Sequence, residues 1–156
     1  MIVMDVDGTL TDGTINIGNS GEIFKQFYCR DGLAIIEAKK NGIIPVILTS
    51  RESEIVKCRS DELGIEHVYQ GCTDNKRKQL ERILAVLGVE WCNVAYIGDD
   101  KNDLECMRDC SIAGCPCNAV QSVRKQADYI CRHDGGQGAV REFIDWILED
   151  KRRNQI

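Results

Sequence analysis

The chain has 156 residues, a length that suits one domain with a real hydrophobic core. Hydrophobic residues make up 43% and charged residues 29%, which is typical of a soluble globular protein. The net charge of -5 argues against a nucleic-acid partner, because binding the phosphate backbone needs a basic face. No apolar run approaches the ~20 residues that cross a bilayer, and the apolar start of the chain is too short for a secretory signal. These features favour a cytoplasmic protein without a membrane partner.

Short apolar runs alternate with helical stretches along the chain, which predicts βαβ units and a parallel sheet. Residues 2–4 form the first expected strand. Residues 14–17 and 22–28 are expected to pair as a β-hairpin around the glycine-containing turn at 18–21. Asp31 then stands where an N-cap would begin a helix, and Gly42 stands where that helix would end.

The remaining elements follow the same alternation. Strands are expected at 43–48, 68–69, 94–97, 111–113 and 129–131, with the last two at outer positions. Helices are expected at 52–63, 76–87, 100–109 and 139–148. The helix at 76–87 is the clearest, because its leucines and isoleucine share one face and Gly88 ends it.

Nine cysteines are scattered through the chain, and no two have the CxxC spacing of zinc ribbons or thioredoxins. Cys115 and Cys117 are the only tight pair, and one intervening residue is an unusual metal spacing. We interpret the cysteines as reduced thiols that serve as small apolar residues.

Polar clusters follow three of the expected strands. Asp5-Val6-Asp7-Gly8-Thr9 follows the first, Thr49-Ser50-Arg51 follows the second, and Gly98-Asp99-Asp100, with Asp103 one turn on, follows a later one. In open α/β sheets, ligands bind beyond the carboxyl ends of the strands. Neighbouring carboxylates repel one another strongly in a partly dry site. An all-oxygen acidic site of this kind suits Mg²⁺.

These clusters resemble the motifs of the haloacid dehalogenase superfamily. Asp5 to Thr9 looks like its first motif, Thr49 like its second, Lys76 like its third, and Asp99 to Asp103 like its fourth. All four occur in order and together span nearly the whole chain, which makes the resemblance specific. It implies a single domain over residues 1–156 with a Rossmann-like, doubly wound parallel sheet.

The resemblance also implies a phosphatase mechanism. Asp5 would attack phosphorus and form an aspartyl-phosphate. Asp7 would protonate the leaving oxygen and later deprotonate the attacking water. Thr49 would hydrogen-bond a phosphoryl oxygen. Lys76 would neutralise charge on the phosphoryl group and on Asp5.

Magnesium would be held by the Asp5 carboxylate, the Asp7 backbone carbonyl and Asp99, with Asp100 and Asp103 supporting those ligands. The third motif leaves one ambiguity. Lys76 belongs to the basic run Lys76-Arg77-Lys78, and the loop before it is one residue longer than expected. Lys78 is therefore the alternative active-site lysine.

Between the first motif and the next helix there is room only for the hairpin at 14–28, and none for a cap domain. The chain thus resembles the capless branch that hydrolyses 3-deoxy-octulosonate 8-phosphate and related nine-carbon 9-phosphates. Further segments match that branch, namely 5–13, 27–32, 69–71, 94–98 and 135–142. Relatives in this branch resemble homotetramers in which a neighbouring subunit closes the site, and the apolar hairpin suits that assembly.

Sugar-acid recognition is expected at a set of residues near these motifs. The expected substrate-binding residues are Asp7, Arg30, Asp31, Gly32, Ser50, Arg51, Arg59 and Lys76. Nonulosonate phosphatases tend to place Glu where Arg51 stands, so Arg51 favours the octulosonate. Against this, an arginine of the octulosonate enzymes aligns with Ile36.

Other functions remain open at this point. Similar capless domains fused to sugar-nucleotide synthetases can serve oligomerisation without catalysis, but Asp5, Asp7, Thr49, Lys76 and Asp99 are all intact here. A broad phosphatase or a phosphotransfer mutase is a further alternative. The missing cap argues against a mutase, which must keep water from its phosphoenzyme.

Overall fold

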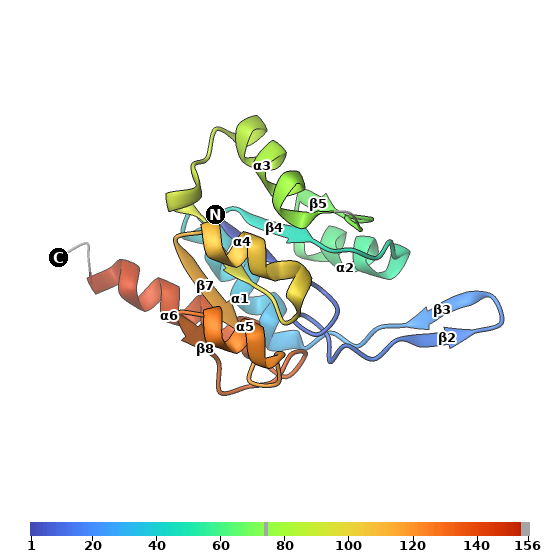
Figure 1. Cartoon of the computed structure of the whole chain (residues 1–156). Coiled ribbons are helices and arrows are strands. Elements are labelled where there is room, and N and C mark those ends of the chain that lie inside the picture. Colours follow the sequence, from blue (N-terminus) through green and yellow to red (C-terminus); the bar gives the residue numbers. More distant parts are fainter. Residues whose placement is uncertain (74, 154–156) are drawn as a thin grey trace.

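Parallel strands form the central sheet of this computed structural model, which describes residues 1–73 and 75–153 (Figure 1). Within that part of the chain the sheet has six strands in the order β5-β4-β1-β6-β7-β8. All neighbours pair in parallel. The strands are β1 (Ile2–Met4), β4 (Pro45–Leu48), β5 (His67–Tyr69), β6 (Ala95–Ile97), β7 (Ile112–Cys115) and β8 (Tyr129–Ile130).

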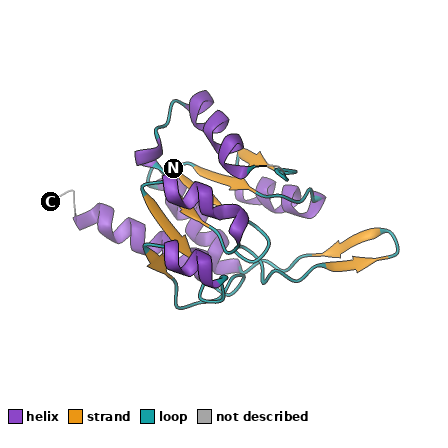
Figure 2. Cartoon of the chain, viewed as in Figure 1, coloured by secondary structure: helices purple, strands orange, loops and turns teal. Residues whose placement is uncertain are grey.

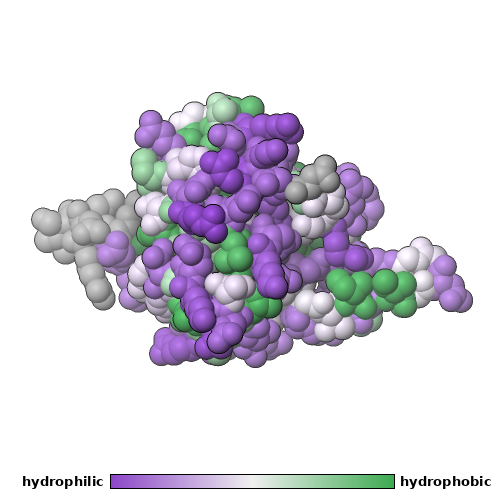
Figure 3. Space-filling view, viewed as in Figure 1, coloured by the Kyte–Doolittle hydropathy of each residue, from purple (hydrophilic) through white to green (hydrophobic). Residues whose placement is uncertain are grey.

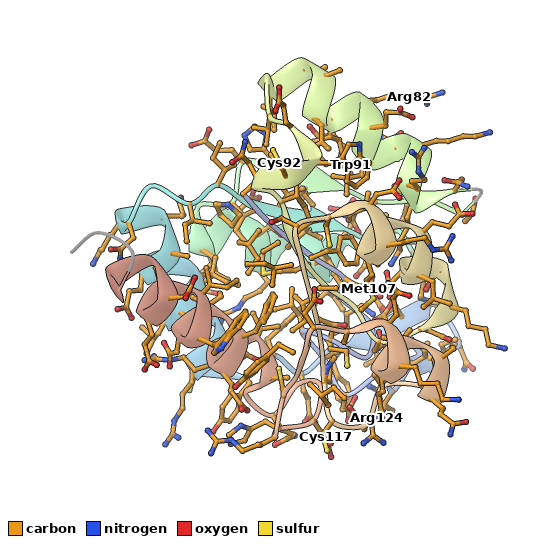
Figure 4. All side chains as sticks on the ribbon, turned by 60° about the vertical axis from the view of Figure 1, so that its left-hand side comes forward. Arg82, Trp91, Cys92, Met107, Cys117 and Arg124 are labelled. Atoms are coloured by element: carbon orange, nitrogen blue, oxygen red, sulfur yellow. The ribbon has the colours of Figure 1, made fainter. Side chains whose placement is uncertain are left out.

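Helices cover both faces of this sheet, because alternate residues of each strand point to opposite sides. In β1, Ile2 and Met4 pack in one apolar layer and Val3 in the other. The first layer includes α1 (Cys29–Lys40), α2 (Glu54–Leu63) and α6 (Ala139–Arg153). The second includes α3 (Lys76–Leu87), α4 (Leu104–Asp109) and α5 (Gln121–Gln126), with Met107 of α4 buried in it (Figure 4). The doubly wound α/β fold is therefore confirmed.

The order of the strands places the expected site. The chain runs from β1 outward to β4 and β5, and then returns to β6 on the other side of β1. Met4 pairs with Ile47 of β4 and with Ile97 of β6. Because the three strands are parallel and in register, the residues that follow them meet at one edge of the sheet. Ligands bind at such a topological switch point.

The hairpin projects away from this body, as Figures 1 and 2 show. It consists of β2 (Asn16–Gly18) and β3 (Gly21–Phe24), paired antiparallel. Both strands are shorter than expected. The predicted second strand extended to residue 28, but pairing ends at Phe24, and the side chain of Lys25 is buried against Asp7 in the body.

Asp31 was expected to be the N-cap of its helix, and this is wrong. Helix α1 begins two residues earlier, at Cys29, with Tyr28 as the N-cap. Asp31 lies in the first turn and is 1% exposed. Its Oδ1 accepts a hydrogen bond of 2.7 Å from the backbone N–H of Arg141 in α6. This hydrogen bond connects the start of α1 to the start of α6.

The other elements lie where they were expected, with shifted ends in several of them: β4 begins at Pro45, α2 begins at Glu54 and α6 runs on to Arg153. The helix at 76–87 and its end at Gly88 are confirmed. The stretch expected as one helix at 100–109 is a 3-10 turn, Lys101–Asp103, followed by α4. Strand β7 lies inside the sheet, not at an outer position. Helix α5 was missed because it has only six residues.

Two broader expectations can be compared with the structure. In the described part of the chain, no helix combines the length and the apolar character needed to cross a membrane. All nine cysteines lie among the described residues, and each is free of disulfide bonds.

The contact between Asp31 and α6 predicts a pH-dependent stability. Burial raises the pKa of Asp31 to about 6, although the N–H of Arg141 opposes this. Between the ordinary pKa of an aspartate and about pH 6, the folded protein keeps a proton on Asp31 that the unfolded chain has already released. The free energy of unfolding therefore falls as the pH rises from the ordinary pKa through the raised one. Asp31→Asn keeps the acceptor for Arg141 without the charge.

We expect Asp31→Asn to gain stability relative to wild type by about 1–1.5 kcal/mol between about pH 5 and about pH 8. Thermal unfolding of both proteins across that range measures this difference. A difference that stays constant with pH contradicts the assignment.

Candidate active site

Three carboxylates and one lysine form the centre of the candidate site. Asp5 follows β1, Asp99 and Asp103 follow β6, and a carboxylate oxygen from each lies within 4.8 Å of the others. Lys76 opens α3 and is 2% exposed. Its Nζ lies 2.8 Å from Oδ1 of Asp5 and 2.7 Å from Oδ1 of Asp103. Of the two lysines considered, Lys76 is therefore the one in the cluster, and Lys78 is exposed on α3.

Asp103 has both carboxylate oxygens occupied by protein donors. Its Oδ1 accepts hydrogen bonds from Lys76 and, at 2.7 Å, from the hydroxyl of Tyr96. Its Oδ2 accepts from the backbone N–H groups of Asp99 and Asp100 at 3.1 and 3.2 Å. This saturation makes Asp103 a brace for Lys76 and for the turn after β6. It agrees with the supporting role expected for Asp103.

Electrostatics in the cluster favour a bound cation. Burial raises the pKa of Asp5 to about 7, and the charge of Asp103 adds to the effect. Burial also raises the pKa of Asp99 to about 6, again with a contribution from Asp103. Burial alone would lower the pKa of Lys76, but Asp5 and Asp103 raise it, so the lysine stays charged. One lysine thus faces three carboxylates, and a second cation would relieve the remaining repulsion.

Glycines allow the loops of the site to approach each other closely. Gly8 has a φ of +94°, and a Cβ at this position would lie 2.1 Å from Oδ2 of Asp99. A Cβ on Gly135, in the loop before α6, would lie 1.8 Å from the carbonyl oxygen of Gly8. Thr9 donates a hydrogen bond of 3.2 Å to Oδ1 of Asp99. The loop after β1 therefore holds Asp99 directly beside Asp5.

Asp7 lies between two cations at the rim of the cluster. Lys25, from the base of the hairpin, forms an ion pair with Oδ1 of Asp7. The Nε of Arg51 lies 3.7 Å from Oδ2 of Asp7, and the Arg51 side chain is 46% exposed. Arg51, which was expected to bind substrate, is thus placed at the mouth of the site next to the expected acid and base.

The loop after β4 forms the opposite wall. Thr49 follows this strand directly and is buried. Ser50 donates a hydrogen bond of 3.2 Å to the carbonyl of Cys72 and accepts one of 3.2 Å from the side chain of Asn102. These contacts join the loops after β4, β5 and β6 at the positions where the sequence predicted phosphate and substrate contacts.

Several expected site residues lie elsewhere in the chain. Asp100 is exposed and caps the 3-10 turn through a hydrogen bond of 2.7 Å to the N–H of Lys101. Its side chain is therefore a helix cap, and its expected supporting role at the metal stays a prediction. Asp31 lies outside the acidic cluster, with Oδ1 taken by the N–H of Arg141, and Gly32 follows it in α1, so a contact of either with a substrate stays a prediction.

Two expected arginines line separate hollows. Arg30 lies with Arg132 and Glu142 around a surface hollow of about 300 Å³. Arg59 pairs with Glu62 at 2.7 Å and lies 5.9 Å from the ring of Phe27. Neither belongs to the acidic cluster of its own chain.

Sequence reasoning missed three residues that organise the site. Thr9 was quoted as part of the first motif without a role. Tyr96 looked like an ordinary core residue, because its neighbours in β6 are apolar. Lys25 gave one signal that could have been used, since it is the only cation in the hairpin segment at 14–28.

The residues present fit Mg²⁺. The Asp5 and Asp99 carboxylates are hard oxygen donors, and they are clustered, largely buried and short of positive charge. Magnesium is commonly bound by one or two carboxylates together with water and substrate phosphates. In this set Asp5 and Asp99 would hold the ion, and Asp103 would fix their surroundings.

Comparison with known proteins agrees with this geometry. Residues 22–110 match the family described as haloacid dehalogenase-like hydrolase. The chain is 40% identical over 148 residues to the 3-deoxy-D-manno-octulosonate 8-phosphate phosphatase of Escherichia coli K12, covering 95% of this chain and 78% of that protein. The chain belongs to the haloacid dehalogenase-like hydrolases.

Solved structures support the same family. A crystal structure of the 3-deoxy-D-manno-octulosonate 8-phosphate phosphatase from Moraxella catarrhalis, in complex with magnesium, phosphate and KDO, has a TM-score of 0.91 and 42% identity, covering 95% of this chain and 84% of that one. The Yersinia pestis phosphatase has a TM-score of 0.90 and 38% identity, covering 94% and 79%. The expected enzyme class, a phosphoric monoester hydrolase, is confirmed by these relatives.

The two lysines of α3 offer a matched test of the cluster. Lys76→Met leaves three carboxylates without their lysine, and losing one partner of a buried ion pair costs about 3 kcal/mol. We expect the free energy of unfolding to fall by about this amount without Mg²⁺. The variant also lacks the positive charge that offsets the negative charges of Asp5 and phosphate, and this should lower kcat at least about 100-fold.

Lys78→Met is the control, because it removes an exposed lysine two residues away. It should change stability by less than about 0.5 kcal/mol and leave phosphate release near the wild-type rate. Thermal unfolding and phosphate release measure both variants. Equal effects of the two substitutions contradict the placement of Lys76.

Proposed function

We propose that this chain is a magnesium-dependent phosphatase that hydrolyses 3-deoxy-D-manno-octulosonate 8-phosphate. The observation that carries the proposal is the set Asp5, Lys76 and Asp99 at the meeting point of β1 and β6, where a nucleophile, a buried cation and a metal ligand share one small space. The octulosonate is inferred from the relatives, above all the Moraxella protein in complex with magnesium, phosphate and KDO.

In the proposed reaction, an oxygen of Asp5 attacks phosphorus and an aspartyl-phosphate forms as the bond to the sugar oxygen breaks. Lys76, 2.8 Å from Asp5, offsets the negative charge that nucleophile and phosphate bring together. Asp7 gives its proton to the leaving sugar oxygen. It then takes a proton from the water that hydrolyses the aspartyl-phosphate.

Magnesium would be held by the Asp5 and Asp99 carboxylates and by the backbone carbonyl of Asp7. When bound, it supplies further positive charge at the phosphoryl oxygens and lowers the repulsion between phosphate and nucleophile. Thr49 would hydrogen-bond a phosphoryl oxygen from the end of β4. Asp103 keeps Lys76 in place throughout.

The choice of sugar depends on the mouth of the site. Arg51 is partly exposed there and lies 3.7 Å from Asp7, so its guanidinium can reach the part of the substrate next to the phosphate. Carboxylates and hydroxyls are good partners for such a group. This favours the octulosonate over the nine-carbon sugar-acid phosphates, for which a glutamate is expected at this position.

The hairpin supports a proposal of self-assembly. Ile17, Ile23 and Phe24 are 66%, 60% and 45% exposed, and Figure 3 shows an apolar surface on the projecting arm. We propose that the hairpins of a homotetramer cover these side chains and that a neighbouring subunit helps to close the site. Light scattering distinguishes this assembly from a 17.5 kDa monomer.

The free cysteines suit the reducing cytoplasm.

A phosphate-release panel across sugar-acid phosphates tests the proposed function. With Mg²⁺ present, we expect the octulosonate 8-phosphate to have the highest kcat/KM. Asp5→Asn should reduce turnover to background, because the amide has nearly the same shape but is not a nucleophile. Asp7→Asn should lose about 10²–10⁴-fold, the usual size of general acid–base catalysis.

Both variants should keep the wild-type circular dichroism spectrum, which separates lost chemistry from lost fold. Turnover by Asp5→Asn near the wild-type rate, with deamidation excluded, contradicts the mechanism. A clear preference for a nine-carbon 9-phosphate would keep the mechanism and change the substrate. A protein that releases no phosphate from any ester would instead support an assembly domain.

A further inference from the structure

Lys25 is a buried cation that the proposed mechanism does not use. It follows β3 at the base of the hairpin, and its side chain is 1% exposed. Its Nζ pairs with Oδ1 of Asp7 and, at 3.0 Å, with Oε1 of Glu22. A lysine is rarely this buried unless its charge has partners, and here both partners are carboxylates.

The second partner ties Lys25 to the body of the protein. Glu22 accepts a hydrogen bond from the hydroxyl of Ser53, the N-cap of α2. Although burial opposes it, hydrogen bonds from Ser53 and Lys25 keep the pKa of Glu22 below its ordinary value. Glu22 therefore stays ionised. The ammonium group is held from two sides, and its position on Asp7 is fixed by α2 as well as by the hairpin.

The contacts of Lys25 make the two oxygens of Asp7 unequal. Oδ1 is taken by the lysine. Oδ2 is buried and accepts no hydrogen bond from the residues that the structure describes, and the Nε of Arg51 lies 3.7 Å from it. An oxygen without a partner in the resting protein is the one free to exchange a proton with substrate.

We propose that Lys25 is a positioning residue for the reaction: it holds Asp7 by Oδ1 and so presents Oδ2 to the leaving oxygen of the substrate. The inference rests on the proposed function and adds a hairpin residue to it. As the Asp5–phosphorus bond forms and the phosphorus–oxygen bond breaks, the proton on Oδ2 passes to the sugar oxygen. Asp7 becomes negative in this step, and Lys25, which keeps its own proton, lies next to the new charge.

The test compares two esters that differ in their need for a proton donor. The leaving oxygen of a sugar phosphate must be protonated as it departs, whereas para-nitrophenolate can leave without a proton. The ratio kcat/KM includes only the steps through departure of the leaving group, so hydrolysis of the aspartyl-phosphate does not contribute.

Lys25→Met removes the charge and keeps the length of the side chain. We expect it to lower kcat/KM on the sugar phosphate at least about tenfold, the size of one lost charge-assisted hydrogen bond. On para-nitrophenyl phosphate the loss should be under about threefold. Lys25→Arg should restore most of the loss, because it keeps a cation on Oδ1.

Two controls separate positioning from a loosened hairpin. Glu22→Gln weakens the tie to α2 and leaves Lys25 on Asp7, so it should affect the sugar phosphate less than Lys25→Met. In an Asp7→Asn background, Lys25→Met should cause no further loss, as expected when one residue acts through the other.

Equal losses on both esters, or additive losses with Asp7→Asn, would overturn the proposal and leave Lys25 as a hairpin anchor. These outcomes are distinct from failure of the proposed function. A wild-type protein inactive on both esters contradicts the proposed function and this inference together, whereas equal losses from an active wild type contradict only the role of Lys25.

Discussion

The rest of the site depends on the ion pairs that the buried Lys76 forms with Asp5 and Asp103. Lys76 lies between Asp5 and Asp103, and among the residues that the structure describes it is the cation that contacts the three-carboxylate cluster. Charges so close together in a partly dry site are tolerable only when cations offset them. Lys76 provides part of that offset, and the remaining excess of negative charge favours a bound cation.

The same physical rule organises the rim. Asp7 is a further carboxyl group close to the cluster, and the cations Lys25 and Arg51 lie next to it. One comes from the hairpin and the other from the loop after β4, so three separate parts of the chain converge on one carboxylate. A chain with only a hairpin between β1 and α1 thus uses ion pairs to hold that insertion against its site.

Residues whose roles follow from strand ends could be predicted from sequence. Asp5 and Asp99 follow apolar strands, so the topology brings them to one edge of the sheet. Lys76 was predicted from its resemblance to the third motif, with Lys78 as the alternative, and the structure places Lys76 in the cluster. The roles of Asp31 and Asp100 were harder to predict, because an acidic residue near a helix start can cap the helix, hold a neighbouring element in place or bind a ligand. Their burial and partners decide between these roles. The sequence marks Lys25 only as a cation in the hairpin segment, and its contact with Asp7 could not be predicted because it depends on how the hairpin leaves the body.

The central claim is that the acidic cluster is a magnesium site built from Asp5 and Asp99. Thermal unfolding at about pH 8, with and without Mg²⁺, tests it without any assumption about substrate. Saturating metal at about 100 times its dissociation constant should stabilise the wild type by about 2.7 kcal/mol, or about 5–10 °C for a chain of this size. Asp99→Asn should lose most of that gain while keeping its fold. A wild type that Mg²⁺ does not stabilise, or an Asp99→Asn variant that gains as much as the wild type, would contradict the account.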